Sequence, residues 1–404
     1  MNNFSIKRGK LGHTLVDSFF FISIILSLFA VQQYVPKASL IMRWISLPLI
    51  LLYISSILKK SRIYGISYYI VLLAGTILHI GLLPLNDVIN DFYAWVSLVM
   101  LLVLSANLDM KSLLPIRILL IIFVLECLVA LFERLTETLI FPAMEIIEHT
   151  NEYADDKTFR SYSLMGHPLT NANVTSIIMA FVLCTKKMNN YLKWMLLLLG
   201  TIALWAFNSR AAMLYWMAVF TYKLFFAKLK ISYFVVGGLL MAFVIIPLGE
   251  YLYEAGYFGR LEFDFSDSST ETRFDALLYF MMYPWGTTDI INGGRLLYMP
   301  GSDLLIENGI LVTLGYWGII IGSLKVVLEF IISYKFLVNY KFSDKLIIFM
   351  ALWLVGLGNN NTFTVYPLLF FMYCNMAFNL YKPEVLRNLR VDRRRDRLSS
   401  CSSK

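Results

Sequence analysis

Long apolar runs recur along the whole chain, and they constrain its fold more than any other feature. Hydrophobic residues make up 58% of the 404 positions and charged residues only 15%. A soluble domain typically carries about a quarter charged residues, so this composition excludes a water-soluble globule and a disordered chain. A helix needs roughly 20 mostly apolar residues to cross a bilayer. The sequence therefore predicts an all-α protein that crosses a membrane many times.

Hydropathy divides the chain into a transmembrane domain, residues 1–385, and a basic tail, residues 386–404. We predict about twelve transmembrane helices in the first part, with boundaries uncertain by several residues. The predicted spans are 14–34, 40–58, 66–84, 90–106, 113–133, 168–186, 191–207, 211–227, 231–249, 312–337, 345–358 and 365–381.

Connections rich in Lys and Arg alternate along the chain with connections that are poor in them. This alternation predicts how the spans are oriented in the membrane. With the N-terminus inside, the basic connections fall on the cytoplasmic side, and they hold Lys59, Lys60, Arg62, Lys111, Lys186, Lys187, Lys193, Lys228, Lys230, Lys341 and Lys345. Both termini are then cytoplasmic. Two long connections, about 134–167 and 250–311, fall outside. We interpret the arginine-rich tail as an anchor against anionic lipid, not as a nucleic-acid binder, because it has no aromatic interleaving.

The second long connection contains the pattern of an amphipathic helix. Ser268 and Glu271 have the spacing of a capping box, and apolar residues recur every three or four positions from Phe274 to Met282. Pro284 then ends the pattern. We predict a helix over 269–283 that lies on the outer face of the bundle.

A few arginines lie close to predicted spans on the outer side. Arg210 occupies a very tight turn within 208–212, Arg160 precedes the Gly-His-Pro of 166–168, and Arg273 lies in the second long connection. A guanidinium donates two parallel hydrogen bonds to a phosphate, so arginines from different loops could together bind a diphosphate. The alternative is that each extends to lipid headgroups. The turn at Arg210 is too short for a generic polar loop, which favours function there.

Ionisable residues also occur inside the apolar runs, where they are costly and usually face a partner or a cavity. Lys325 and Glu329 are four residues apart, and we predict that they pair with each other. His79 and Glu126 are expected to find partners within the bundle. His167 is a candidate proton carrier or phosphate ligand, although a His before Pro at a helix start more often only satisfies the turn.

Motifs of nucleotide binding, zinc proteolysis and serine hydrolysis are missing: the sequence has no GxxxxGK[ST], HExxH, GxSxG or GxGxxG. The four cysteines include no CxxC, and the acidic residues of the second long connection match no calcium-loop spacing. We therefore expect neither a cofactor nor a metal ion.

Four short segments, in this order and on the predicted outer side, resemble bacterial polysaccharide polymerases of the Wzy type, in the superfamily that includes the O-antigen ligases. They are RSYSLMGHP at 160–168, NSRAA at 208–212, Thr272-Arg273 through Pro284-Trp285-Gly286, and DLLIENG at 303–309. In the last segment ligases usually carry His-Asn where this chain has Glu307-Asn308, which favours a polymerase over a ligase.

The resemblance implies an inverting, metal-independent glycosyl transfer at the outer face of the bacterial inner membrane. The donor would be a growing glycan on undecaprenyl diphosphate, and the acceptor a repeat unit on the same carrier. The residues expected to bind diphosphate and substrate are Arg210, Arg160, Arg273 and Asn308. The residues expected to accept the proton of the acceptor hydroxyl are, in order of preference, Glu307, Asp303 and His167.

Three alternatives remain open from the sequence: an O-antigen ligase, a flippase for lipid-linked glycans, and an accessory membrane protein without catalysis. A flippase would carry more cationic residues inside its spans and shorter outer loops. The product could be O-antigen, capsule or exopolysaccharide. Membrane lipid, a chain-length regulator and a flippase are the expected partners.

Overall fold

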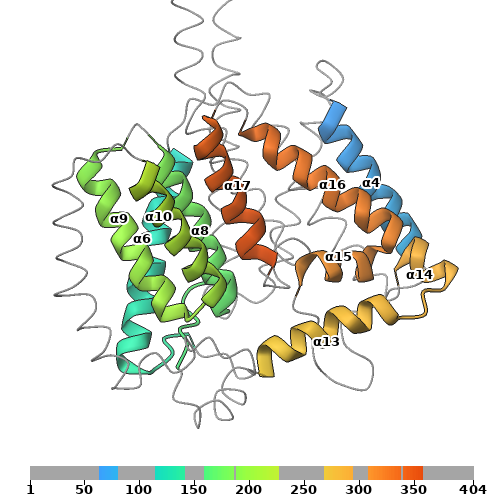
Figure 1. Ribbon diagram of the computed structural model, residues 1–404, viewed down its shortest axis with the longest axis horizontal. Coiled ribbons are helices and arrows are strands. Elements are labelled where there is room, and N and C mark those ends of the chain that lie inside the picture. Colours follow the sequence, from blue (N-terminus) through green and yellow to red (C-terminus); the bar gives the residue numbers. More distant parts are fainter. Residues whose placement is uncertain are drawn as a thin grey trace, which may run out of the picture.

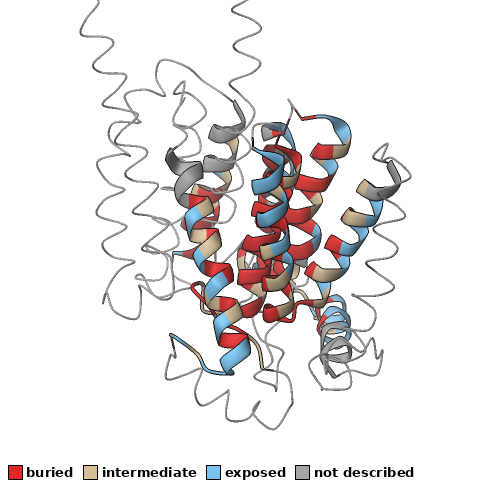
Figure 2. Ribbon diagram, turned by 90° about the vertical axis from the view of Figure 1, so that its left-hand side faces the viewer, coloured by how far each residue is buried: buried red, intermediate tan, exposed pale blue. Residues whose placement is uncertain are grey.

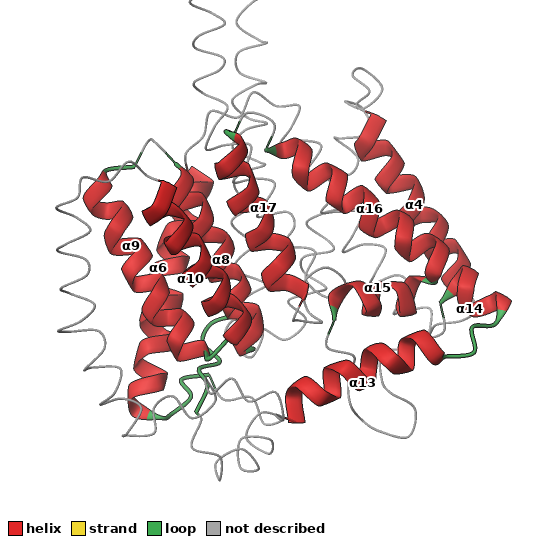
Figure 3. Ribbon diagram, viewed as in Figure 1, coloured by secondary structure: helices red, strands yellow, loops and turns green. Residues whose placement is uncertain are grey.

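The computed structural model describes residues 63–80, 114–141, 159–185, 188–226, 268–293, 308–337 and 340–357. All the elements within these ranges are α-helices, which confirms the predicted all-α class (Figures 1 and 3). They are α4 (Ile63–His79), α6 (Leu114–Thr136), α8 (Pro168–Cys184), α9 (Asn190–Phe207), α10 (Arg210–Phe226), α13 (Ser268–Met282), α14 (Thr287–Asn292), α15 (Gly309–Trp317), α16 (Ile319–Phe336) and α17 (Phe342–Leu357). The spans predicted at 14–34, 40–58, 90–106, 231–249 and 365–381 lie outside the described residues.

Within the described ranges, α9 is the one helix that is both long and apolar enough to cross a membrane, while α8 and residues 70–79 of α4 are shorter apolar helices. Two other helices have the length but carry more charge. The 23 residues of α6 include Glu126 and Glu133, and the 18 residues of α16 include Lys325 and Glu329. All four of these side chains are buried.

Helix α8 is the centre of a group formed with α6, α9, α10 and α17. All but Leu169 and Leu183 of its 17 residues are buried, as the red ribbon in Figure 2 shows. Close packing against α9 depends on Gly200, because a Cβ there would lie 2.5 Å from Met179 Sδ. A glycine at a helix contact lets two backbones approach more closely than any larger residue permits.

Helices α4, α14, α15 and α16 form a second group beside it (Figure 1). The ring of His79 stacks on Trp317 with centroids 4.8 Å apart. The predicted span 312–337 is wrong as a single helix, because the chain breaks between α15 and α16 at Gly318. There φ is +81°, and a Cβ would lie 2.7 Å from the carbonyl oxygen of Ile291. Only glycine adopts that backbone without strain.

The helix predicted over 269–283 is present as α13, although Ser268 begins the helix instead of preceding it. The apolar residues of the predicted pattern are exposed in the structure: Phe274, Leu277, Leu278, Met281 and Met282. Ala276 is buried with Val312 of α15, whereas Met281 and Met282 are exposed. In Figure 1, α13 lies across the end of the molecule at which α8 and α10 begin.

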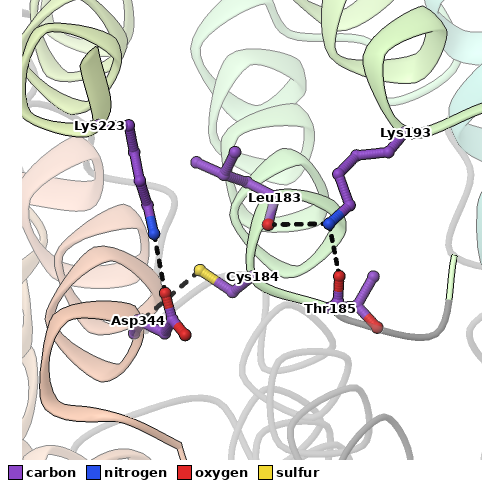
Figure 4. Close-up of polar contacts among 6 residues, drawn as sticks. All are labelled: Leu183, Cys184, Thr185, Lys193, Lys223 and Asp344. Carbon is purple, nitrogen blue, oxygen red and sulfur yellow. Dashed lines mark hydrogen bonds and ion pairs between the residues drawn. The ribbon is translucent and has the colours of Figure 1, made fainter. Parts of the chain in front are cut away.

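At the other end of these helices two lysines bind neighbouring elements (Figure 4), and one of them, Lys193, is among the residues that the sequence predicts to be cytoplasmic. Lys193 Nζ donates to the carbonyl oxygens of Leu183 and Thr185, at 3.3 and 2.5 Å, where α8 ends. Lys223 of α10 pairs with Asp344 of α17 at 2.9 Å. A cation near the C-terminal end of a helix satisfies carbonyl groups that the helix leaves unpaired. The start of α9 therefore lies beside the end of α8, and the start of α17 beside the end of α10.

The ion pair predicted within α16 is confirmed. Lys325 Nζ lies 2.7 Å from Glu329 Oε1, and both side chains are 0% exposed. One turn further, Ser333 Oγ accepts a hydrogen bond from Trp353 Nε1 of α17 at 3.1 Å. A polar strip therefore runs along the buried face of α16.

Removing one partner of this pair should destabilise the protein more than removing both. Lys325→Met leaves the Glu329 carboxylate buried without its counter-charge, which costs roughly 3–5 kcal/mol. The double variant Lys325→Met/Glu329→Gln should regain most of that loss. Thermal unfolding of the purified protein in detergent measures both effects, and equal destabilisation by the single and double variants would contradict the pairing.

Candidate functional site

Two buried carboxylates on α6 hold the segment that carries Arg160 and His167, which we call the Arg160 loop (residues 159–167). Glu133 Oε2 accepts hydrogen bonds from Ser161 Oγ at 2.6 Å and from the backbone N–H groups of Tyr162 and Ser163, each at 2.9 Å. Its Oε1 accepts from the N–H of Ile140 at 3.0 Å. Four donors thus satisfy one fully buried carboxylate.

Glu126 lies two turns earlier on the same face of α6. Its Oε2 accepts from the N–H of Leu164 at 3.1 Å, and its backbone oxygen accepts from Ser163 Oγ at 2.9 Å. Ser163 and Gly166 have φ values of 42° and 71°, so the loop turns tightly through left-handed conformations. These contacts give Glu126 a structural role, as the sequence suggested.

The Arg160 loop also contacts the last turn of α9, just before the turn that leads into α10. The N–H of Ser161 donates to the carbonyl oxygen of Ala206 at 3.1 Å. Arg134 Nη1 donates to the carbonyl oxygen of Phe159, and the Arg134 guanidinium lies 5.2 Å from the centre of the Trp205 ring. Segments far apart in sequence are therefore joined at one end of the α8 group.

The structure thus brings Arg160, His167 and Arg210 to the same end. Arg210 is the first residue of α10 and follows Asn208, whose left-handed backbone (φ 51°) ends α9. Both arginines are half-buried. A cation at a helix N-terminus opposes the helix dipole, so helix stability does not explain Arg210. Helix N-termini favour anions, and α8 and α10 both begin here.

His167 occupies the N-cap position of α8, with Pro168 in the first turn. Its backbone is extended, and its side chain makes no capping hydrogen bond to the helix. The imidazole is therefore not the N-cap acceptor of α8. The predicted roles as proton carrier or phosphate ligand stay predictions.

The other expected residues belong to the second long connection. Arg273 lies in α13, whereas Glu307 and Asp303 lie outside the described residues. Asn308 is the N-cap of α15: its Oδ1 accepts from the N–H groups of Ile310 and Leu311 at 3.0 and 3.1 Å. Asn308 therefore has a structural function, and its contact with substrate stays a prediction. In Figure 1, α13 lies at the lower end of the molecule, and α15 lies between α13 and α16.

Sequence reasoning missed the role of Glu133 entirely. The available signal was an acidic residue at the C-terminal end of an apolar run, two turns after another acidic residue. Among the residues described, no group of three or more His, Cys, Asp or Glu side chains is arranged to hold a metal ion. What the site offers is arginine, imidazole and helix N-termini, which together suit an anion.

Comparison with known proteins assigns no family: no family model matches the chain, and no curated protein matches its sequence significantly. The functional argument therefore depends on the residues and contacts described above.

Substitutions at Asn308 can separate capping from substrate binding. Asn308→Ala should lower the free energy of unfolding by about 1 kcal/mol, because the N–H groups of Ile310 and Leu311 lose their acceptor. Asn308→Asp keeps the cap and should retain stability in thermal unfolding. If Asn308 also contacts substrate, as the sequence predicts, Asn308→Asp will impair the predicted activity although the cap is intact, whereas normal activity would reduce Asn308 to a capping residue.

Proposed function

We propose that the chain polymerises oligosaccharide repeat units linked to undecaprenyl diphosphate into a surface polysaccharide, at the outer face of the bacterial inner membrane. The reaction transfers the growing glycan from its carrier to a sugar hydroxyl of the next lipid-linked unit. The glycosidic bond to the diphosphate breaks, and a new glycosidic bond forms. A chain-length regulator and a flippase are the expected partners.

The convergence of Arg160 and Arg210 carries this proposal. The hydrogen bond from Ser161 to Ala206 at 3.1 Å places the two arginine-bearing segments side by side. These are also two of the segments that resemble the Wzy-type polymerases. Their joining at one end supports a diphosphate site, because the leaving diphosphate develops negative charge that fixed cationic donors stabilise.

The direction of the helices supports the predicted sidedness. Lys193 lies in the first turn of α9 and Lys223 in the last turn of α10, whereas the Arg160 loop contacts the last turn of α9 through Ala206, so the lysines lie at the other end of these helices. A cytoplasmic lysine end puts the Arg160 loop on the outer face of the membrane, where exported lipid-linked units are found.

Proton removal from the acceptor hydroxyl needs a base within hydrogen-bonding reach. Glu307 is the first choice because, in the sequence, it is a carboxylate that immediately precedes Asn308, the cap of α15. Asp303 and His167 are the alternatives. No nucleotide is required, since the carrier already activates the glycan.

Lipid-linked products in cells that lack this chain test the function. In cells that lack a polymerase, repeat units are still exported and attached to the surface acceptor, but each is attached as a single, unpolymerised unit. Loss of a flippase would instead leave the units trapped on the cytoplasmic side, and loss of a ligase would leave long polymer on the carrier. Only the first outcome agrees with the proposal.

Arg210→Lys should abolish most polymerisation, because lysine keeps the charge but lacks the two-pronged geometry. Arg160→Ala and Arg273→Ala should impair it as well. Arg295→Lys, in the second long connection, is the matched control and should make polymer of normal length. Electrophoresis of the polysaccharide measures the result at equal protein abundance. Full-length polymer from Arg210→Ala would rule out the diphosphate role.

Glu307→Gln tests the base, because glutamine keeps size and hydrogen bonding but accepts no proton. The expected loss of rate is about a hundred- to ten-thousand-fold, with stable protein and near-normal binding of the carrier. Asp303→Asn and His167→Gln are assayed in parallel. If Glu307→Gln makes polymer of wild-type length and one of the other two variants loses polymerisation, the base is the residue changed in that variant.

A further inference from the structure

Arg160 lies between two peptide groups that are fixed from different helices. On one side, the carbonyl oxygen of Phe159 accepts from Arg134 of α6. On the other, the N–H of Ser161 donates to Ala206 of α9, and its hydroxyl donates to Glu133. The backbone on both sides of the arginine is therefore held in place before any ligand binds.

Glu133 contributes most of this fixation. Its Oε2 receives three donors from consecutive residues, Ser161, Tyr162 and Ser163, all within 2.9 Å. Successive backbone N–H groups that converge in a turn form a concavity that binds anions. Here that concavity is filled by a carboxylate of the protein itself, and the carboxylate is 0% exposed. It locks the loop and leaves diphosphate recognition to side chains.

Replacing the Glu133 carboxylate with an amide puts a hydrogen-bond donor where the protein has an acceptor. Glutamine has one oxygen and one NH₂ group, so its NH₂ donor would face either the N–H of Ile140 or the donors of the Arg160 loop, and the neutral amide oxygen is a weaker acceptor than a carboxylate in both orientations. A buried donor without an acceptor is costly. In the Glu133→Gln variant the loop would therefore separate from the side chain at position 133 and move. The backbone at Arg160 would then lose its fixed place beside the α9–α10 turn.

We propose that Glu133 is a positioning residue for lipid diphosphate: it holds the Arg160 loop so that Arg160 and Arg210 bind the same anion. This inference rests on the diphosphate site of the proposed function but not on the polymerisation reaction. Glu133 itself, buried behind the loop, does not touch the ligand. It acts through Arg160, and that dependence can be measured.

The test is a double-mutant cycle on binding of undecaprenyl diphosphate without sugar to the purified full-length chain in lipid nanodiscs. Glu133→Gln and Arg160→Ala should each weaken binding about tenfold, the loss expected for one charge-assisted contact. In the Arg160→Ala background, Glu133→Gln should weaken it less than about twofold further, because the residue through which it acts is gone. Glu137→Gln, an exposed carboxylate just after α6, is the matched control and should bind normally.

Hydrogen exchange of the same variants separates positioning from unfolding. In Glu133→Gln the amides of Tyr162 and Ser163 should lose protection, while those of α9 keep it. Ser161→Ala removes a single donor to Glu133 and serves as the milder variant, with about two- to threefold weaker binding and the same lack of additivity.

Each outcome decides one proposal. Additive losses in the cycle, or normal binding by both Glu133→Gln and Ser161→Ala, overturn the positioning role. The same holds for a wild-type chain that binds no diphosphate. Wild-type binding with the predicted cycle but no polymer formation overturns the proposed function and leaves the positioning role standing.

Discussion

The carboxylate of Glu133 is the interaction on which the candidate site depends. A charge buried at the end of an apolar helix is tolerated only where hydrogen bonds replace its hydration. Here four donors do so, three of them from residues 161–163 of the Arg160 loop. The same bonds that satisfy the charge determine where the loop lies. One arrangement therefore satisfies both the buried charge of Glu133 and the backbone N–H groups of the loop. A change in the carboxylate or in the loop would disturb both.

The contact between Glu133 and the Arg160 loop determines which other elements meet at this end of the α8 group. The fixed loop joins the end of α9 through Ser161 and Ala206, and α10 begins a few residues later at Arg210. Helix α8 begins at the other end of the same loop. The lysine-rich end, about one helix length away, is held by separate contacts of Lys193 and Lys223. The two ends thus differ in chemistry: one offers arginines beside helix starts, the other offers cations at helix ends.

Local patterns in the sequence predicted local structure well. The apolar runs predicted α9 and α10 to within one residue of their observed starts, and the periodicity after Ser268 predicted α13. The Lys325–Glu329 pair was predictable because helix geometry alone brings residues four apart together. The break at Gly318 was missed, since hydropathy continues across it and only the close approach of Ile291 demands a glycine there.

The contacts of the site itself were beyond reach. Glu133 and Ser161 are 28 positions apart, and no periodicity relates them, because their pairing is set by how α6 and α9 pack around α8. The arginines were identifiable one by one from their location near spans. That Arg160 and Arg210 share one end could be inferred from sidedness, but the bonds that fix them there could not.

Reconstitution tests the central claim most directly. The purified chain in vesicles would be given the repeat unit linked to undecaprenyl diphosphate, with a chelator present and no nucleotide sugar. The account predicts a ladder of lipid-linked products that grows by whole repeat units, and its loss on Arg210→Lys. A wild-type chain that leaves every unit single under these conditions, while it stays folded, would contradict the account.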